Sequence, residues 1–208
     1  PASYVGAFDA IRKRFAREPL ALERGYTLGT FSFNSGNGRC PTCGGNGFEH
    51  VEMQFLSDVY LRCPDCDGKR FRPEILEIRI RRDGGPLLSI ADVLELTVSE
   101  AVGVFAADRE VMARLEPLVA VGLDYLRLGQ PVPTLSGGEA QRLKLAGHLA
   151  DVKPVRARAS GLADGKSAHL PGTLFLFDEP TTGLHFDDVA KLLGAFKRLL
   201  DAGSSLVV

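Results

Sequence analysis

Four cysteines in two matched pairs constrain the fold of this chain more than any other feature of its sequence. Two residues separate Cys40 from Cys43 and Cys63 from Cys66, which gives the pattern C-x2-C-x19-C-x2-C. Two residues between thiolates allow one tight turn to direct both sulfurs at a single ion, and two such turns complete a tetrahedral S4 site. The spacing therefore predicts one structural Zn²⁺ bound by Cys40, Cys43, Cys63 and Cys66.

Other states of these thiols stay open from the sequence. They could form disulfide bonds or lie unpaired in a core, and an iron–sulfur cluster uses the same ligands. The chain shows no signal peptide and no apolar run near the roughly 18 residues needed to cross a membrane. These features favour a cytoplasmic protein without membrane contact, in which disulfides are rare. A catalytic zinc is disfavoured because four thiolates leave no open coordination position.

Basic and aromatic residues flank the cysteine pairs and suggest contact with nucleic acid. The net charge of the chain is −1, but residues 1–82 carry 13 Lys and Arg against 10 Asp and Glu. Basic side chains contact phosphates without reading base sequence, and aromatic rings stack on exposed bases. Alternatively, the rings Phe48, Phe55, Tyr60 and Phe71 pack a small core and the basic residues are simply solvated. The candidate DNA-binding residues are Arg39, Arg62, Lys69, Arg70 and Arg72.

Apolar periodicity predicts the elements of the N-terminal half. A short amphipathic helix is expected over residues 8–16. Apolar residues that alternate with polar ones predict strands over 51–55 and over 74–80. The Gly-Gly-Pro sequence at 84–86 predicts a turn, which we take as the end of a zinc-binding module over residues 1–86.

The C-terminal half has the pattern of an α/β core. Residues 90–128 show helical periodicity, with Thr97 and Glu100 at the spacing of a capping box. The run TLFLF at 173–177 is typical of a buried parallel strand, and a helical pattern over 189–200 precedes the strand-like SSLVV. A strand–helix–strand order indicates an α/β fold. We predict a helical region over 87–150, an exposed loop over 151–172 and part of the α/β core over 173–208.

The string LSGGEAQRLKLA at 135–146 predicts a helix with an anion-binding N-terminus. Ser136 can cap the helix and Glu139 can reach back to it. Gly137 and Gly138 have no side chains to cover their N–H groups, which the helix dipole makes attractive to an anion. An ordinary capped helix is the alternative for the four residues S-G-G-E alone.

The string LFLFDEP at 174–180 places two acids at the end of a strand. Ligands bind at the carboxyl ends of strands in open α/β sheets. Asp178 suits an Mg²⁺ held through water, and Glu179 suits polarisation of an attacking water. The alternative is a strand that merely ends in two acids. The sequence has no G-x4-G-K-[ST] motif, because residues 161–167 have one residue too few between their glycines.

LSGGEAQR followed by DEPTTGLH resembles the ABC ATPases and, more narrowly, the UvrA family. The specific cues are the segments TFSFN, VGLDYLRLGQ and TTGLH, with the cysteine pairs between the first of them and the signature string. The resemblance covers nearly the whole chain and is to the C-terminal half of the family's members. It implies a partial ABC-type P-loop NTPase domain, with signature helix and Walker B strand, that carries an inserted helical and zinc-ribbon-like module.

The resemblance also implies roles for particular residues. In the intact protein, ATP and Mg²⁺ lie between the P-loop of one ABC module and the signature of another. Glu179 would be catalytic, and His185 would lie in the loop at the module interface. The nucleotide-binding residues would be Ser136, Gly137, Gly138, Glu139, Gln141, Asp178 and His185.

The family further implies partners and a repair function. Expected partners are DNA, UvrB, the second ABC module of the same chain and a second subunit of a homodimer. The function would be recognition of DNA damage in nucleotide excision repair, with the zinc module beside the DNA path. The alternative is a UvrA-like ABC ATPase that acts in drug resistance or self-protection and has no repair role. The P-loop, Q-loop and switch histidine are expected outside these 208 residues, so the chain alone is expected to be inactive.

Overall fold

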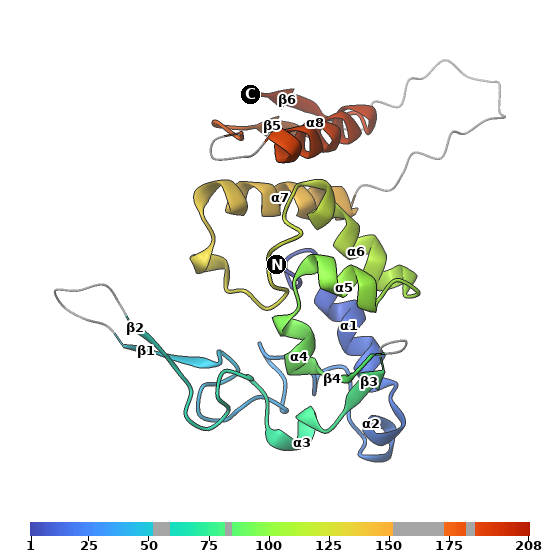
Figure 1. Ribbon diagram of the computed structural model, residues 1–208, viewed down its shortest axis with the longest axis vertical. Coiled ribbons are helices and arrows are strands. Elements are labelled where there is room, and N and C mark those ends of the chain that lie inside the picture. Colours follow the sequence, from blue (N-terminus) through green and yellow to red (C-terminus); the bar gives the residue numbers. More distant parts are fainter. Residues whose placement is uncertain (52–58, 82–84, 152–172, 182–185) are drawn as a thin grey trace. The chain divides into compact units, whose positions relative to one another are not determined.

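The computed structural model describes residues 1–51, 59–81, 85–151, 173–181 and 186–208. It divides into two compact units (Figure 1). One, here called the cysteine unit, comprises residues 7–96, and the other, the signature unit, comprises residues 1–6 and 97–208. The predicted loop over 151–172 falls outside the described residues, except for its first residue.

The cysteine unit joins short helices to two small hairpins. Helix α1 (Ala7–Ala16) confirms the predicted amphipathic helix and buries Phe8, Ile11 and Phe15. Strands β1 (Phe48–Val51) and β2 (Val59–Arg62) pair antiparallel, with Phe48 opposite Arg62, and Figure 1 shows this ribbon extending away from the unit's helices. The remaining elements are α2 (Pro19–Glu23), α3 (Pro73–Leu76), β3 (Arg79–Arg81), β4 (Leu87–Ser89) and α4 (Ile90–Glu95).

The strand predicted over 74–80 is only partly correct. Its first half is the single helical turn α3, because Pro73 stands at the first helical position, where its fixed φ favours a helix. Strand β3 starts at Arg79 and pairs antiparallel with β4, with Ile80 opposite Leu88. Residues 85 and 86 of the predicted turn lie between β3 and β4, whereas residue 84 lies outside the described residues. The division between the two units falls after Leu96. Of the strand predicted over 51–55, the structure describes only Val51, at the end of β1.

Two helices of the signature unit, α5 (Val98–Val104) and α6 (Arg109–Ala120), lie within residues 90–128, where the periodicity predicts helices. The third helix of that stretch, α4, belongs to the cysteine unit. Thr97 caps α5 through its side chain, and Glu100 completes the predicted capping box with an N–H···O distance of 2.8 Å to the Thr97 backbone. The 3₁₀ turn η1 (Val132–Thr134) leads from these two helices into α7 (Gly137–Asp151), the helix of the signature string.

A βαβ unit completes the signature unit, as predicted. Strand β5 (Leu174–Leu176) pairs parallel with β6 (Ser205–Val207), and α8 (Phe186–Asp201) connects them. The ring of Phe177 packs on Phe196 of α8, with 4.6 Å between ring centroids. The prediction that the first strand is buried is wrong for this structure, since the side chains of Leu174 and Leu176 are 59% and 73% exposed. A sheet of two strands covered by one helix leaves the outward-facing residues uncovered.

Helices long and apolar enough to cross a bilayer are absent from the part of the chain that the structure describes.

Candidate metal centre and nucleotide-binding elements

The four cysteines converge in the cysteine unit on a site for one ion. Their sulfurs all lie within 4.8 Å of one another, with 3.9 Å between Cys40 and Cys63 and 3.7 Å between Cys43 and Cys66. A tetrahedral site with metal–sulfur bonds of ~2.3 Å separates its sulfurs by ~3.8 Å. All four thiols are buried and free, so the disulfide alternative is wrong here. The spread fits a mononuclear site and is too narrow for a cluster of several irons.

Backbone hydrogen bonds tie the two cysteine turns to each other. The N–H of Cys40 donates to the carbonyl of Arg70 at the end of the second turn, at 2.9 Å. In return, the N–H of Cys63 donates to the carbonyl of Gly47 at the end of the first turn, at 3.1 Å. The N–H of Gly47 also donates to the Cys43 sulfur, at 3.2 Å. These bonds hold the sulfurs together by the backbone as well as by any bound ion.

The surroundings of Cys40 and Cys66 shift the pKa values of these two thiols in opposite directions. Burial raises the pKa of Cys66 to about 12. Burial also opposes ionisation of Cys40, but hydrogen bonds from the N–H groups of Cys43 and Thr42 outweigh it and lower its pKa to about 7. Because a metal binds thiolates, binding of Zn²⁺ at neutral pH would release protons, among them that of Cys66.

Neighbouring glycines of the first turn give a matched test of its packing. Gly44 and Gly45 both have positive φ, of 60° and 94°. A Cβ at Gly44 would meet no atom within 4 Å, whereas one at Gly45 would collide with the carbonyl oxygen of Phe33. We expect Gly44→Ala to cost about 1 kcal/mol and Gly45→Ala about 3 kcal/mol, because only the second adds a backbone clash to the strained φ. Urea unfolding of the zinc-loaded chain measures both, and equal midpoints would contradict this packing.

Two of the five predicted DNA-binding residues are held inside the cysteine unit. The Arg39 guanidinium is half-buried, and it donates to the carbonyls of Gly36, Asn34 and Gly44 at 2.8, 3.0 and 3.2 Å. The Arg70 guanidinium lies over the ring of Phe33, 5.0 Å from its centroid, and burial lowers its pKa. These two side chains hold the loops around the cysteines in place.

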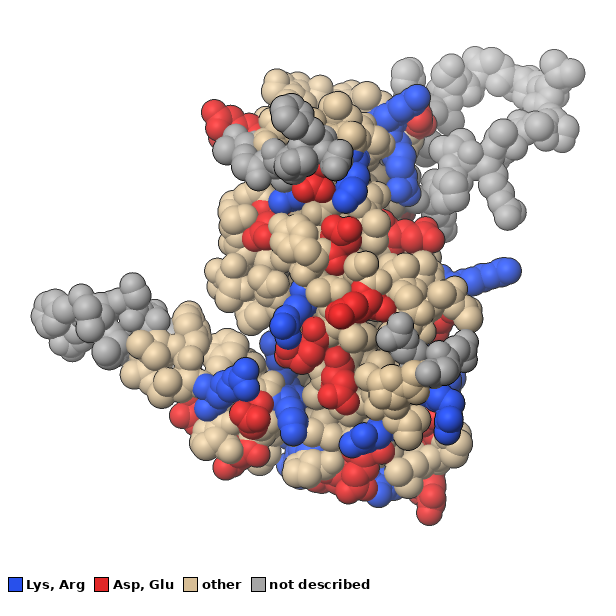
Figure 2. Space-filling view, viewed as in Figure 1, with Lys and Arg blue, Asp and Glu red and all other residues tan. Residues whose placement is uncertain are grey.

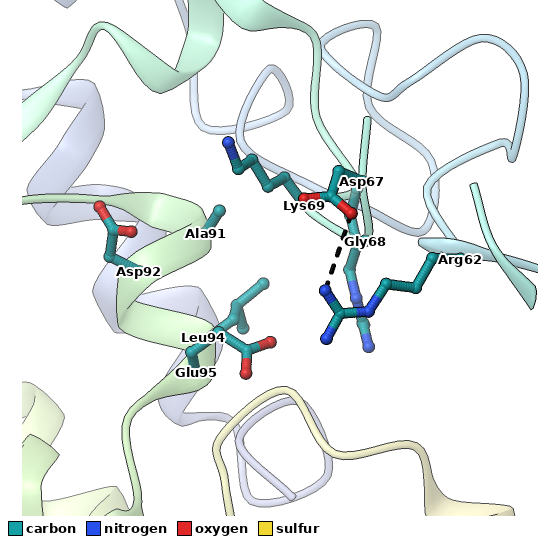
Figure 3. Close-up of a pocket in the computed structure, with 9 residues that line it drawn as sticks. Arg62, Asp67, Gly68, Lys69, Ala91, Asp92, Leu94 and Glu95 are labelled. Carbon is teal, nitrogen blue, oxygen red and sulfur yellow. Dashed lines mark ion pairs between the residues drawn. The ribbon is translucent and has the colours of Figure 1, made fainter. Parts of the chain in front are cut away.

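The other three, Arg62, Lys69 and Arg72, are exposed. Arg62 and Lys69 line a pocket of about 300 Å³ between the second cysteine turn and α4. Figure 3 shows Arg62 paired with Asp67 on one side of this pocket and Glu95 of α4 on the other; the pair is 3.7 Å long. Basic and acidic side chains are likewise interspersed over the face in Figure 2. On the face that Figure 2 shows, the described residues therefore offer separate basic contacts rather than one large basic patch.

The aromatic residues predicted to stack on bases likewise fall into a buried group and an exposed group. Phe71 is only 1% exposed, so it belongs to the core and its predicted role at the surface is wrong. Tyr60 on β2 is 57% exposed and packs edge-on against Phe48 of β1, with 5.1 Å between centroids. Phe55 lies outside the described residues.

Helix α7 has the predicted capped N-terminus. The hydroxyl of Ser136 accepts the N–H of Glu139 at 3.3 Å, and the Glu139 carboxylate accepts the N–H of Ser136 at 2.7 Å. The N–H groups of the first helical residues, Gly137 and Gly138, have no acceptor within the helix itself. A Cβ at Gly137 would meet no atom within 4 Å, so the space beside that residue is open. The arrangement suits an anion bound by main-chain N–H groups.

The acid pair lies exposed after β5, in the same unit. Glu179 has a φ of 42°, a left-handed conformation that is uncommon for a residue with a side chain and often marks a functional site. The side-chain amide of Gln141, on α7, donates to the backbone carbonyl of Asp178 at 3.4 Å. The signature helix is thus directly linked to the acid pair. His185 lies outside the described residues.

Two residues around the signature helix were not among the predicted site residues. The Arg142 guanidinium is buried and donates to the carbonyls of Gly122, at 3.1 Å, and of Gly138, at 3.4 Å. Tyr125 donates its hydroxyl to the carboxylate of Glu139 at 2.6 Å. Both belong to strings that carry the family resemblance, but their roles depend on tertiary contacts, and no spacing in the sequence reveals those contacts.

Comparison with known proteins accounts for the combination of these elements. No family model matches the chain. The whole chain aligns with UvrABC system protein A of Thermus thermophilus at 50% identity and with that of Methanothermobacter thermautotrophicus at 49%. The crystal structure of UvrA2 from Deinococcus radiodurans matches 99% of the chain with a TM-score of 0.81 and 46% identity, and the match covers 23% of that protein.

The mixed helix-and-sheet fold and the four clustered cysteines, with these matches, place the chain among proteins of the ABC ATPase family. Within that class, the chain belongs to the UvrA family. It spans about a fifth of the length of the curated relatives that it matches, which are covered to 20% and 19%.

Proposed function

We propose that this chain is part of a UvrA-type, DNA-binding ABC ATPase that recognises DNA damage in nucleotide excision repair. The observation that carries the proposal is the open N-terminus of α7, where Gly137 lies next to open space in a sequence that matches the ABC signature. The exposed acids Asp178 and Glu179 lie in the same unit. Membership of the UvrA family supplies the biological context.

Phosphate binding and activation of the attacking water would be carried out by different parts of the signature unit. Ser136, Gly137 and Gly138 would bind the γ-phosphate of an ATP held by another ABC module, in the same chain or in a second subunit of a homodimer. Asp178 would hold Mg²⁺ through water, and Glu179 would polarise the attacking water. His185, in the predicted interface loop, would contact the partner module. Because the 208 residues contain no P-loop motif, hydrolysis would require a longer protein.

The cysteine unit would bind one structural Zn²⁺ and contribute to the DNA surface. The sulfur separations fit the tetrahedral thiolate site that Zn²⁺ prefers. Once zinc is bound, four thiolate ligands leave no position for a reacting water, so its role would be structural. Of the predicted DNA contacts, the exposed residues Arg62, Lys69 and Arg72 are those that can reach phosphates in solution.

DNA binding by the full-length protein tests the repair function. Wild-type protein is expected to prefer DNA with a bulky lesion over undamaged DNA and to load UvrB at the lesion. The triple variant Arg62→Gln, Lys69→Gln, Arg72→Gln is expected to bind both DNAs more weakly, and the slope of log K against log salt should fall by about 0.9 for each phosphate that the variant no longer neutralises. Arg17→Gln, an exposed arginine of the same unit, serves as the control. Equal affinity for both DNAs without a response to UvrB would refute the repair function.

That outcome would favour a UvrA-like ATPase for drug resistance or self-protection. The chain is 46% identical to a protein that bears the distinct name UvrA2, so its similarity is not confined to proteins named UvrABC system protein A. UvrABC system protein A of Micrococcus luteus is also 46% identical to the chain, so identity does not assign the chain to one of the two names.

A further inference from the structure

The carboxylate of Glu139 is held from two sides at the start of α7. One oxygen accepts the hydroxyl of Tyr125 at 2.6 Å, and the other accepts the N–H of Ser136 at 2.7 Å. The second contact is local, because it closes a capping box over three residues. The first reaches across the fold from the loop between α6 and η1.

This loop is itself fixed, so Tyr125 is a firm anchor. The carbonyls on either side of it, of Asp124 and Leu126, accept the N–H groups of Ser99 and Val98 at the start of α5, both at 2.9 Å. Leu126 is buried. The ring of Tyr125 remains 52% exposed, so its hydroxyl is available to Glu139 while the residue adds little to the core.

The position of the Glu139 charge matters for an anion at the same helix end. The dipole and the unpaired N–H groups of the first turn attract a phosphate, and they also attract this carboxylate. A carboxylate free to rotate would therefore cover the N–H groups of Gly137 and Gly138 or repel the phosphate that approaches them. A carboxylate with both oxygens engaged elsewhere leaves these groups accessible.

We propose that Tyr125 is a positioning residue for nucleotide binding: its hydroxyl holds the Glu139 carboxylate beside the α7 N-terminus and keeps the Gly137 and Gly138 N–H groups open to the phosphate. The inference rests on the proposed function of the signature helix. The ionisation of the pair agrees with it. Burial opposes a charge on Glu139, but hydrogen bonds from Tyr125 and Ser136 outweigh it and lower the pKa of Glu139. Burial and the same bond raise the pKa of Tyr125, which keeps the phenol a donor.

Steady-state ATP hydrolysis by the full-length protein tests this role. Tyr125→Phe keeps the ring and removes the hydroxyl, and kcat/KM for ATP is expected to fall roughly tenfold, the scale of one hydrogen bond to a charged group. Most of the fall should lie in KM, because a misplaced carboxylate competes with bound phosphate throughout the reaction. Tyr4→Phe is the matched control, since Tyr4 packs at Gly147 near the other end of α7, and its kinetics should equal wild type.

A double-mutant cycle with Glu139→Gln separates positioning from general stability. In the Glu139→Gln background there is no charge to misplace, so adding Tyr125→Phe should change kcat/KM by less than about twofold. An equal loss in both backgrounds, or wild-type kinetics for Tyr125→Phe, overturns the inference. If Glu179→Gln abolishes turnover in the same assay while Tyr125→Phe matches wild type, positioning alone has failed. If the wild-type full-length protein hydrolyses no ATP in this assay, the proposed function has failed.

Discussion

Replacing Cys63 by serine is expected to abolish metal binding and to unfold the segment around both cysteine turns. Cys63 is fully buried, and its sulfur lies 3.9 Å from that of Cys40, so a weaker oxygen ligand would remain where the ion requires a thiolate. The binding free energy of structural zinc, about 10–16 kcal/mol in small zinc modules, is also folding free energy. The loss should therefore exceed that from any single substitution in the cysteine unit outside the four cysteines.

Two measurements check this expectation. Elemental analysis should give one zinc per chain for the wild type and almost none for Cys63→Ser. Hydrogen exchange should show protection of the Cys40 N–H, bonded to Arg70, in the wild type and its loss in the variant. Thr42→Ala is the matched control, because it removes only an exposed hydrogen bond to Asp65 between the two turns. Stoichiometric zinc in Cys63→Ser, or retained protection of Cys40, would contradict a structural metal site.

Local patterns explain most of what could be predicted from the sequence. The spacing of the cysteines was sufficient to predict that the four sulfurs converge. Each cysteine pair forms one turn, and the conformation of a turn is set by neighbouring residues. The capping boxes at Thr97 and Ser136 were visible for the same reason, since their partners are three residues away. The parallel βαβ unit followed from one apolar run, one helical period and a second run.

Contacts between distant segments explain the rest. Arg39 and Arg70 are basic residues of the kind that contact DNA phosphates. In the structure, however, Arg39 donates to three backbone carbonyls, and Arg70 lies over a phenyl ring. Nothing in the neighbouring sequence distinguishes them from Arg62, which is exposed. The helical turn at Pro73 was missed for a different reason. The alternation of apolar and polar residues predicts a strand there, but the proline starts a helical turn instead. Tyr125 was missed because its partner, Glu139, lies in another element.

The second large effect is expected from Glu179→Gln in the full-length protein. The side chain is exposed after β5, at the edge where ligands bind in α/β sheets, and the positive φ of Glu179 directs it by an unusual backbone conformation. Glutamine keeps the shape but cannot accept a proton from the attacking water. We therefore expect kcat for ATP to fall by about 10²–10⁴-fold, the usual contribution of a general base, with little change in KM.

Variants of two further carboxylates test whether the effect is specific to Glu179. Asp178→Asn should weaken Mg²⁺-dependent nucleotide binding, because the proposed role of Asp178 is to hold the metal, whereas Glu179→Gln should retain the nucleotide and hydrolyse it slowly. Asp201→Asn removes an exposed carboxylate at the end of α8 and should behave as wild type. Single-turnover hydrolysis and binding of a nonhydrolysable ATP analogue distinguish these cases. Were Glu179→Gln to hydrolyse ATP at the wild-type rate, the acid after β5 would have no part in activating water, and the base would have to come from another segment of the protein.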